Sequence, residues 1–413
     1  MDEPSRLARR LNTADAAALG LGAMLGSGVF AALGFAIESA GSGVLVSLLL
    51  AAFAAYCNAS SSAQLAALYP QSGGTYVYGR KQLNPFWGWI AGWGFIAGKL
   101  ASCTAAALTF GFYVFPAHAK LLALAAVAVL TAVNYFGIQK TVRMTWVLLV
   151  VVLSSLAVAV FALLWGGQAD PNRLAAGGRG TYGILQAAGI LFFAFAGYAR
   201  IATLGEEVLK PRRTIPKAIA IALITVLTLY LIVTMSLLLT INPASLAHAH
   251  APLLQAVEAG RFAFVSPIVK IGAVFAALGV LLSLILGISR TVFAMAAEKD
   301  LSVWFAAVHP RFKTPYRAEI AAGLLTGLLI FLGDIREVIG FSAFTVLSYY
   351  AITNASAWTL PAQKRQHPRR LAAAGFMACA LLALSLPLSS VLSGSLVLGL
   401  GAAFYFIRRR PRM

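Results

Sequence analysis

Four glycines lie within the nine residues Gly20–Gly28, in the middle of an apolar stretch. In a helix interior each glycine is less favourable than alanine by about 1 kcal/mol, so the cluster predicts an interruption. An interruption at Gly26-Ser27-Gly28 exposes backbone N–H groups at the positive end of the following half-helix. The N-terminal end of this half-helix favours a bound carboxylate, and the Ser27 hydroxyl is a further donor for it. The Ala23 carbonyl could accept a hydrogen bond from an ammonium group. Close packing of helices through small residues is the alternative interpretation.

A second segment, Phe192–Arg200, combines aromatic and small residues with one glycine, Gly197, and a charge. Phe193 is placed to close over a small molecule. Carbonyls near Ala194 and Ala196 are placed to accept hydrogen bonds from an ammonium group. The other interpretation of this segment is a packed aromatic stripe.

Three charged residues, Lys99, Arg200 and Lys270, fall inside apolar stretches, where a charge is costly and indicates function by default. Lys99 is expected to repel a cationic side chain and to favour an anionic or neutral one, or to act as a proton-titrating group. A lysine that snorkels or pairs with a carbonyl is the alternative. Lys270 is interpreted as a charge in an outer vestibule that faces Glu258 or Glu38.

Arg200 is expected to pair with Glu206 or Glu207, either as a latch at the inner end of its helix or as a plain ion pair. The apolar stretches contain no nucleophile with a neighbouring base and no cluster of metal-ligating residues. The sequence therefore predicts neither an enzyme nor a bound cofactor or metal.

The elements that must position these residues are long apolar helices. Sixty per cent of the 413 residues are hydrophobic and 11% are charged, too few polar residues to cover a soluble globule. The apolar residues come in blocks of about 20 without strand-like alternation, which predicts helices that cross a lipid bilayer. The net charge of +19 gathers at the ends of these blocks, so the bilayer and not a nucleic acid is the expected partner.

Twelve spans are predicted. Most of the 32 lysines and arginines then lie on the same side of the bilayer as the N-terminus, and this asymmetry predicts that both termini are cytoplasmic. The predicted spans are 14–38, 43–68, 86–115, 119–136, 144–166, 182–204, 216–240, 263–296, 318–333, 336–359, 370–387 and 389–407. Because the interrupted spans are the first and the sixth, the order indicates two inverted repeats with a site at the midplane. A single transmembrane domain is expected over 1–413, with repeats at about 14–166 and 182–359 and extra helices at about 370–407.

Three motifs in the right order resemble the amino acid–polyamine–organocation (APC) superfamily of permeases, and the similarity covers nearly the whole chain. The motifs are Gly26-Ser-Gly-Val-Phe30, Tyr69-Pro-x-Ser-Gly-Gly-x-Tyr76-x-Tyr78 with Trp87-Gly-Trp89, and Phe192-Phe-Ala-Phe-Ala-Gly197 followed by Glu206-Glu207-x-x-Lys-Pro211-Arg-Arg-Thr-Ile-Pro216. The resemblance implies a LeuT-type five-plus-five inverted repeat with two extra helices, and proton- or exchange-coupled transport of amino acids.

The resemblance also implies roles for individual residues. Ala23, Ser27 and Gly28 would hold the α-amino and α-carboxylate groups of an amino acid, and Phe193 would be the gate. Some proton-coupled relatives carry a lysine in the fifth span, where this chain has Val152. Proton and sodium coupling therefore both stay open, with hydroxyls near this position as candidate ligands. These hydroxyls belong to Ser154, Ser155 and Ser283.

The expected function is secondary active transport of amino acids across the cell membrane by alternating access, with neutral or acidic substrates favoured over cationic ones. An exchanger or exporter of amino acids or polyamines is the alternative within transport. A transport-inactive membrane sensor is the alternative outside it. The sequence leaves the oligomeric state open.

Overall fold

The computed structural model describes residues 11–69, 73–137, 142–166, 169–175, 179–202, 208–242, 246 and 249–409. Within these ranges the chain is helical and forms no strand, apart from one isolated bridge between Leu11 and Val208. The predicted all-α fold is confirmed.

The helices vary from single turns to long rods. The first part of the chain holds α1 (Thr13–Met24), η1 (Gly28–Ala32), α2 (Leu33–Ala40), α3 (Val44–Leu68), α4 (Thr75–Gln82), α5 (Pro85–Val114), η2 (Pro116–His118), α6 (Ala119–Tyr135), α7 (Val142–Gly166) and α8 (Asn172–Ala175). The second part holds α9 (Gly180–Phe195), η3 (Ala196–Tyr198), α10 (Ala199–Ala202), α11 (Pro211–Thr240), α13 (Pro252–Glu258), η4 (Ala263–Val265), α14 (Ser266–Ala297), η5 (Val303–Ala306), α15 (Tyr316–Leu332), α16 (Ile335–Trp358), η6 (Ala362–Lys364), α17 (Arg369–Leu384) and α18 (Leu388–Arg409).

Ten helical segments of the described chain are long and apolar enough to cross a bilayer. The two other predicted spans, 318–333 and 370–387, are helical as well, but α15 has 17 residues and α17 has 16. A bilayer core takes about 20 helical residues, so these two are short for an upright crossing. The structure thus shows a polytopic membrane protein with ten helices of spanning length and two shorter ones.

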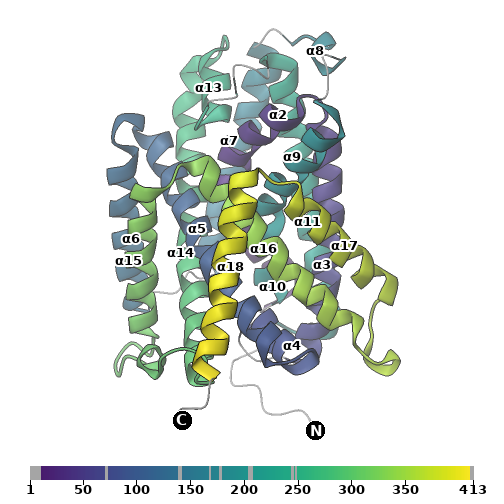
Figure 1. Cartoon of the computed structure of the whole chain (residues 1–413). Helices are drawn as coiled ribbons and strands as arrows, with labels where there is room; N and C mark the ends of the chain where they lie inside the picture. Colours follow the sequence, from purple (N-terminus) through teal and green to yellow (C-terminus); the bar gives the residue numbers. More distant parts are fainter. Residues whose placement is uncertain are drawn as a thin grey trace.

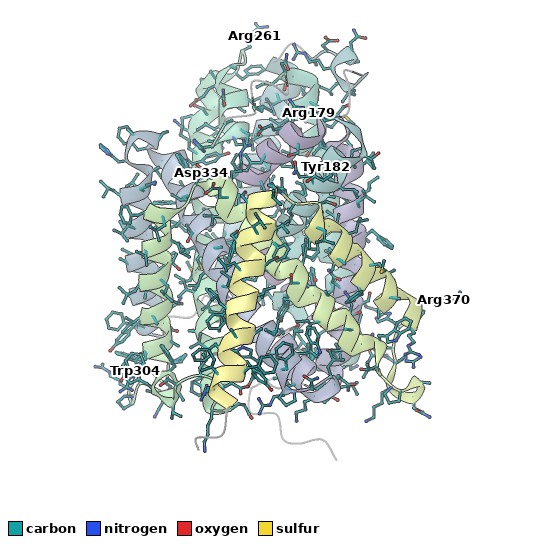
Figure 2. The ribbon with its side chains drawn as sticks, viewed as in Figure 1. Arg179, Tyr182, Arg261, Trp304, Asp334 and Arg370 are labelled. Atoms are coloured by element: carbon teal, nitrogen blue, oxygen red, sulfur yellow. The ribbon has the colours of Figure 1, made fainter. Side chains whose placement is uncertain are left out.

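The long helices run side by side as one bundle (Figure 1). Near its centre α5 packs against α14 and α16, while α1 packs against α11 and α3 against α9. Arg261 lies at one end of the bundle, and Trp304 lies toward the other (Figure 2). Large apolar side chains such as Leu392 and Leu396 on α18 stay exposed on the outside, as expected of a surface that meets lipid.

Both predicted interruptions are present. The first predicted span is divided into α1 and the helix that starts at η1, a π-helical turn. The sixth is divided into α9 and α10 by the 3₁₀ turn η3. The fold brings these two breaks together in the interior.

Candidate functional site

The first break begins where Leu25 leaves helical geometry, with φ −79° and ψ 83°. The N–H of Leu25 still reaches the Leu21 carbonyl at 2.8 Å, but the N–H of Gly26 turns back to the Met24 carbonyl at 3.0 Å. A new helical segment begins at Gly28, and the first N–H groups of such a segment have no partner inside it. The start of this half-helix therefore has the donors and the positive dipole end that suit a carboxylate.

The two breaks touch through glycines. A Cβ atom on Gly197 would lie 2.5 Å from the carbonyl oxygen of Ala23, and one on Gly28 would lie 2.4 Å from the Cβ of Ala194. Only glycine fits at either position without movement of the backbone. Close packing, the alternative interpretation for the first segment, therefore holds for Gly28 together with the interruption, and Gly197 packs as closely.

Tyr230 of α11 joins the two breaks. Its hydroxyl is fully buried and lies 2.8 Å from the Met24 carbonyl oxygen and 3.3 Å from that of Ala194. Its ring packs edge-on against Phe195, with centroids 5.3 Å apart. Tyr230 is not among the residues predicted from the sequence. The available signal was a tyrosine within an apolar span, because a phenol at that depth needs a polar partner.

A cavity of about 220 Å³ lies against the breaks. Drug-sized ligands occupy pockets of about 300–1,000 Å³, so this one suits a smaller metabolite. Its lining includes all nine residues that the sequence assigned to substrate binding, namely Ala23, Gly26, Ser27, Gly28, Lys99, Phe193, Ala194, Ala196 and Gly197. The structure brings these residues to one place, and their role in binding stays a prediction.

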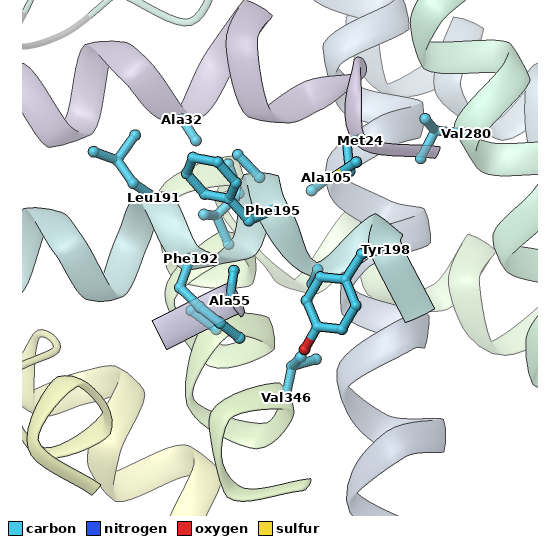
Figure 3. Close-up of a cluster of buried hydrophobic side chains, with 14 of the residues drawn as sticks. Met24, Ala32, Ala55, Ala105, Leu191, Phe192, Phe195, Tyr198, Val280 and Val346 are labelled. Carbon is cyan, nitrogen blue, oxygen red and sulfur yellow. The ribbon is translucent and has the colours of Figure 1, made fainter. Parts of the chain in front are cut away.

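Aromatic residues of the second break anchor it away from the cavity. Figure 3 shows Phe192, Phe195 and Tyr198 extending from this break into a cluster of buried apolar side chains. Phe192 packs edge-on against Tyr350 of α16 with centroids 5.8 Å apart. Phe193 is the aromatic residue of this segment that is only partly buried, and it lines the cavity.

The charged side chains that line the cavity are all basic. They are Lys99 on α5, Arg200 on α10 and Arg290 on α14, and no Asp or Glu of the described residues joins them. Lys99 is 8% exposed, and no described carboxylate lies within ion-pair distance of it. Its ammonium group lies 5.8 Å from the ring centroid of Phe95. The charged groups of the described residues that border the cavity are therefore of one sign.

The cavity extends toward the end of the bundle where α4 lies, because Gly74, Thr75 and Tyr78 also line it. Two side chains of α4 contact Asp300. Arg80 pairs with Asp300 at 2.5 Å, and the Tyr76 hydroxyl donates to Asp300 at 2.7 Å. Burial, together with Asp300, raises the pKa of Tyr76 above its usual range. This network fixes α4 to the loop after α14.

Other predicted coupling residues lie in several places. Arg200 and Ser283 line the cavity, and the Ser283 hydroxyl donates to the Gly279 carbonyl of its own helix at 3.0 Å. Glu206 and Glu207 lie outside the described residues, and so does the predicted contact with Arg200.

The remaining coupling candidates are away from the cavity. Ser154 is exposed, whereas Ser155 is buried under α14, where a Cβ on Gly272 would lie 1.9 Å from its hydroxyl oxygen. Lys270 pairs with Glu258 at 3.3 Å, the first of the two partners expected for it, and both side chains are partly exposed. The structure does not bring these three side chains to the breaks.

Helices of spanning length that enclose a cavity at two helix breaks define the class of polytopic membrane transporters. The chain belongs to the amino acid permease family, whose profile matches residues 11–406. The resemblance to the APC superfamily is confirmed, and the chain is a transporter and not an enzyme.

Three relatives illustrate the range of the family. An uncharacterized transporter of Mycobacterium tuberculosis is 54% identical over 99% of this chain and 93% of its own length. The branched-chain amino acid permease BcaP of Bacillus subtilis is 26% identical over 98% of this chain and 94% of its own length. The human cationic amino acid transporter 4 is 30% identical over 88% of this chain and 61% of its own length.

Proposed function

We propose that this protein is a secondary active transporter of amino acids in the cell membrane, and that it prefers neutral or acidic substrates to cationic ones. The observation that supports this proposal is the small cavity at two touching helix breaks, lined by basic side chains and, among the described residues, by no acidic one. An amino acid presents one carboxylate and one ammonium group, and the breaks offer donors for the first and acceptors for the second.

The carboxylate is placed at the start of η1, where the Ser27 hydroxyl and the backbone N–H groups near Gly28 are the donors. The ammonium group is placed against the carbonyls of Ala23 and Ala196. The Ala194 carbonyl is shared with the Tyr230 hydroxyl, so it contributes less than the sequence analysis expected.

The charge preference rests on Lys99. An unpaired ammonium group next to the bound substrate repels a lysine or arginine side chain and attracts an aspartate or glutamate side chain. The relatives named for cationic and for branched-chain amino acids show that the family accommodates different side chains. The residue at the Lys99 position is therefore proposed to determine specificity in this member.

Transport is proposed to follow alternating access in a LeuT-type five-plus-five repeat, with the extra helices α17 and α18 and both termini in the cytoplasm. With this orientation, α4 and its basic residues face the cytoplasm, and the cavity opens toward that side. On the opposite side Arg336 forms an ion pair with Glu38, which links α16 to α2. The conformation is therefore proposed to be inward-facing.

Uptake of labelled amino acids into proteoliposomes tests the proposal, with an imposed proton gradient, with a sodium gradient and with neither. We expect saturable uptake of a neutral or acidic amino acid that exceeds uptake of lysine or arginine. If no amino acid is taken up or bound, the transport proposal is wrong, and a transport-inactive sensor becomes the better account. If only cationic amino acids are taken up, the preference assigned to Lys99 is wrong. Preloaded vesicles distinguish an exchanger, which needs substrate on both sides.

A further inference from the structure

A glutamate is buried between helices away from the proposed substrate contacts. Glu319 lies in the first turn of α15 and is fully buried. Its Oε1 lies 3.4 Å from the Ser289 hydroxyl of α14. Its Oε2 is buried and has no hydrogen-bond partner among the described residues, and no described cation lies within ion-pair distance.

This environment suits the neutral acid better than the carboxylate. An ionised carboxyl at such a position loses its hydration and gains neither a cation nor a backbone N–H in return. The Ser289 hydroxyl has one proton, and it also reaches the Leu286 carbonyl at a shorter distance of 3.1 Å. When the Ser289 hydroxyl donates its proton to the Leu286 carbonyl, a protonated Glu319 can donate to the Ser289 oxygen instead.

α14 connects this carboxyl to the cavity. Ser289 faces Glu319, whereas the residues on either side of it along α14, Gly287, Arg290 and Thr291, line the cavity. Arg290 follows Ser289 directly in the chain, and it is not within ion-pair distance of Glu319. Loss of the proton from Glu319 therefore creates an attraction for a side chain that borders the substrate.

No other described charge competes for this carboxyl. The elements packed against α15 are α5, α6, α14 and η5. The titratable or charged residues that they and the start of α15 supply are Lys99, Cys103 and Tyr113 on α5, Lys120 and Tyr135 on α6, Lys270 and Arg290 on α14, and Tyr316 and Arg317 on α15 itself. Lys270 is paired with Glu258. Lys99 lines the cavity and Lys120 is exposed at the far end of α6.

We propose that Glu319 is a proton-binding site that couples transport to the proton gradient. The carboxylic acid takes up its proton from the outer side in the alternate conformation and carries it into this inward-facing conformation, where its O–H bond breaks and the proton passes to water on the cytoplasmic side. The carboxylate that remains then attracts Arg290, which keeps all its own protons and moves from the cavity toward α15. The inference rests on the proposed transport function and supplies its driving ion.

The test compares Glu319→Gln with Glu337→Gln, a matched change at an exposed glutamate in the first turn of α16. Both full-length variants are reconstituted in proteoliposomes. A gradient of one pH unit supports at most about a tenfold accumulation at one proton per substrate. We expect Glu319→Gln, which mimics the neutral acid, to keep substrate exchange between the two sides but to lose this accumulation. Glu337→Gln should accumulate substrate like the wild type.

Accumulation by Glu319→Gln that equals the wild type would overturn the inference. A second variant, Ser289→Ala, keeps the acid and removes its hydroxyl partner, so it should shift the midpoint of the pH dependence of uptake. An unshifted midpoint also counts against Glu319, even if Glu319→Gln fails to fold. A wild type that takes up substrate without any response to the proton gradient overturns this inference alone, whereas a wild type that transports no amino acid overturns the proposed function.

Discussion

Replacing Gly197 by alanine is expected to weaken substrate binding, because the new methyl group forces the two helix breaks apart. The added Cβ would lie 2.5 Å from both the carbonyl carbon and the carbonyl oxygen of Ala23, and 2.7 Å from Cγ of Met24. Cβ atoms essentially never come within 3.0 Å of such atoms, and the nearest ones here belong to backbone that cannot rotate away. The start of the substrate site must therefore move by several tenths of an ångström.

The size of the effect follows from the cost of overpacking. One extra methyl group in a packed interior costs about 1–3 kcal/mol, which is about a five- to 150-fold change in an equilibrium constant. If the strain falls on the conformation that binds substrate, the apparent affinity falls by that factor. Initial rates of uptake across a range of substrate concentrations measure the affinity, and thermal unfolding in detergent measures the strain.

Gly399→Ala is the matched control. A Cβ at Gly399 of α18 would have no heavy atom within 4 Å, and alanine favours a helix over glycine by about 1 kcal/mol. This variant should transport like the wild type and be equally stable or more stable. Gly197→Ala with wild-type affinity and wild-type thermal stability would refute the reasoning, because the two breaks would then not need to touch.

Three further changes test other parts of the site. Lys99→Met should raise the ratio of cationic to acidic amino acid uptake by at least about tenfold, because it removes one unscreened positive charge from the cavity. Lys120→Met, at the exposed end of α6, should leave this ratio unchanged. Tyr230→Phe should lower the free energy of unfolding by about 1–3 kcal/mol and reduce transport, because the hydroxyl proton that the Met24 and Ala194 carbonyls share is lost. Glu38→Gln removes the ion pair with Arg336, and we expect it to lower the free energy of unfolding by no more than about 1 kcal/mol. In vesicles we expect this variant to exchange substrate faster than the wild type.

The fold was predictable because its causes are local. A block of about 20 apolar residues without the polar–apolar alternation of a barrel strand is stable in a bilayer only as a helix. The glycines around Gly26 and the motif ending at Gly197 mark the breaks for the same reason, since glycine destabilises a helix wherever it stands. The short helices α15 and α17 were predictable as well, because the predicted spans 318–333 and 370–387 stop at local breakers, Gly333 and the Ser385–Pro387 turn.

The contacts that complete the site were not predictable in the same way. Tyr230 is 206 positions from Met24 along the chain, and Glu319 is 30 positions from Ser289. Neither residue stands in a motif, and each has its function only because a distant helix presents a carbonyl or a hydroxyl to it. Periodicity and propensity describe a helix on its own, so they do not reveal which polar side chain meets which partner.

The placement of the serines bears on how the transporter is driven. The Ser155 side chain of α7 packs against Gly272 of α14, where a side chain on residue 272 would not fit, and Ser154 is exposed. The Ser283 hydroxyl reaches the cavity but is bonded to its own helix. The Met24 carbonyl at the first break, an oxygen of the kind that a sodium ion would use, already accepts from Tyr230. Of the three predicted serines, Ser283 is the one that lines the cavity in the described structure, whereas Glu319 keeps one buried oxygen without a hydrogen-bond partner among the described residues. This buried acid is the reason for which we propose the proton as the driving ion.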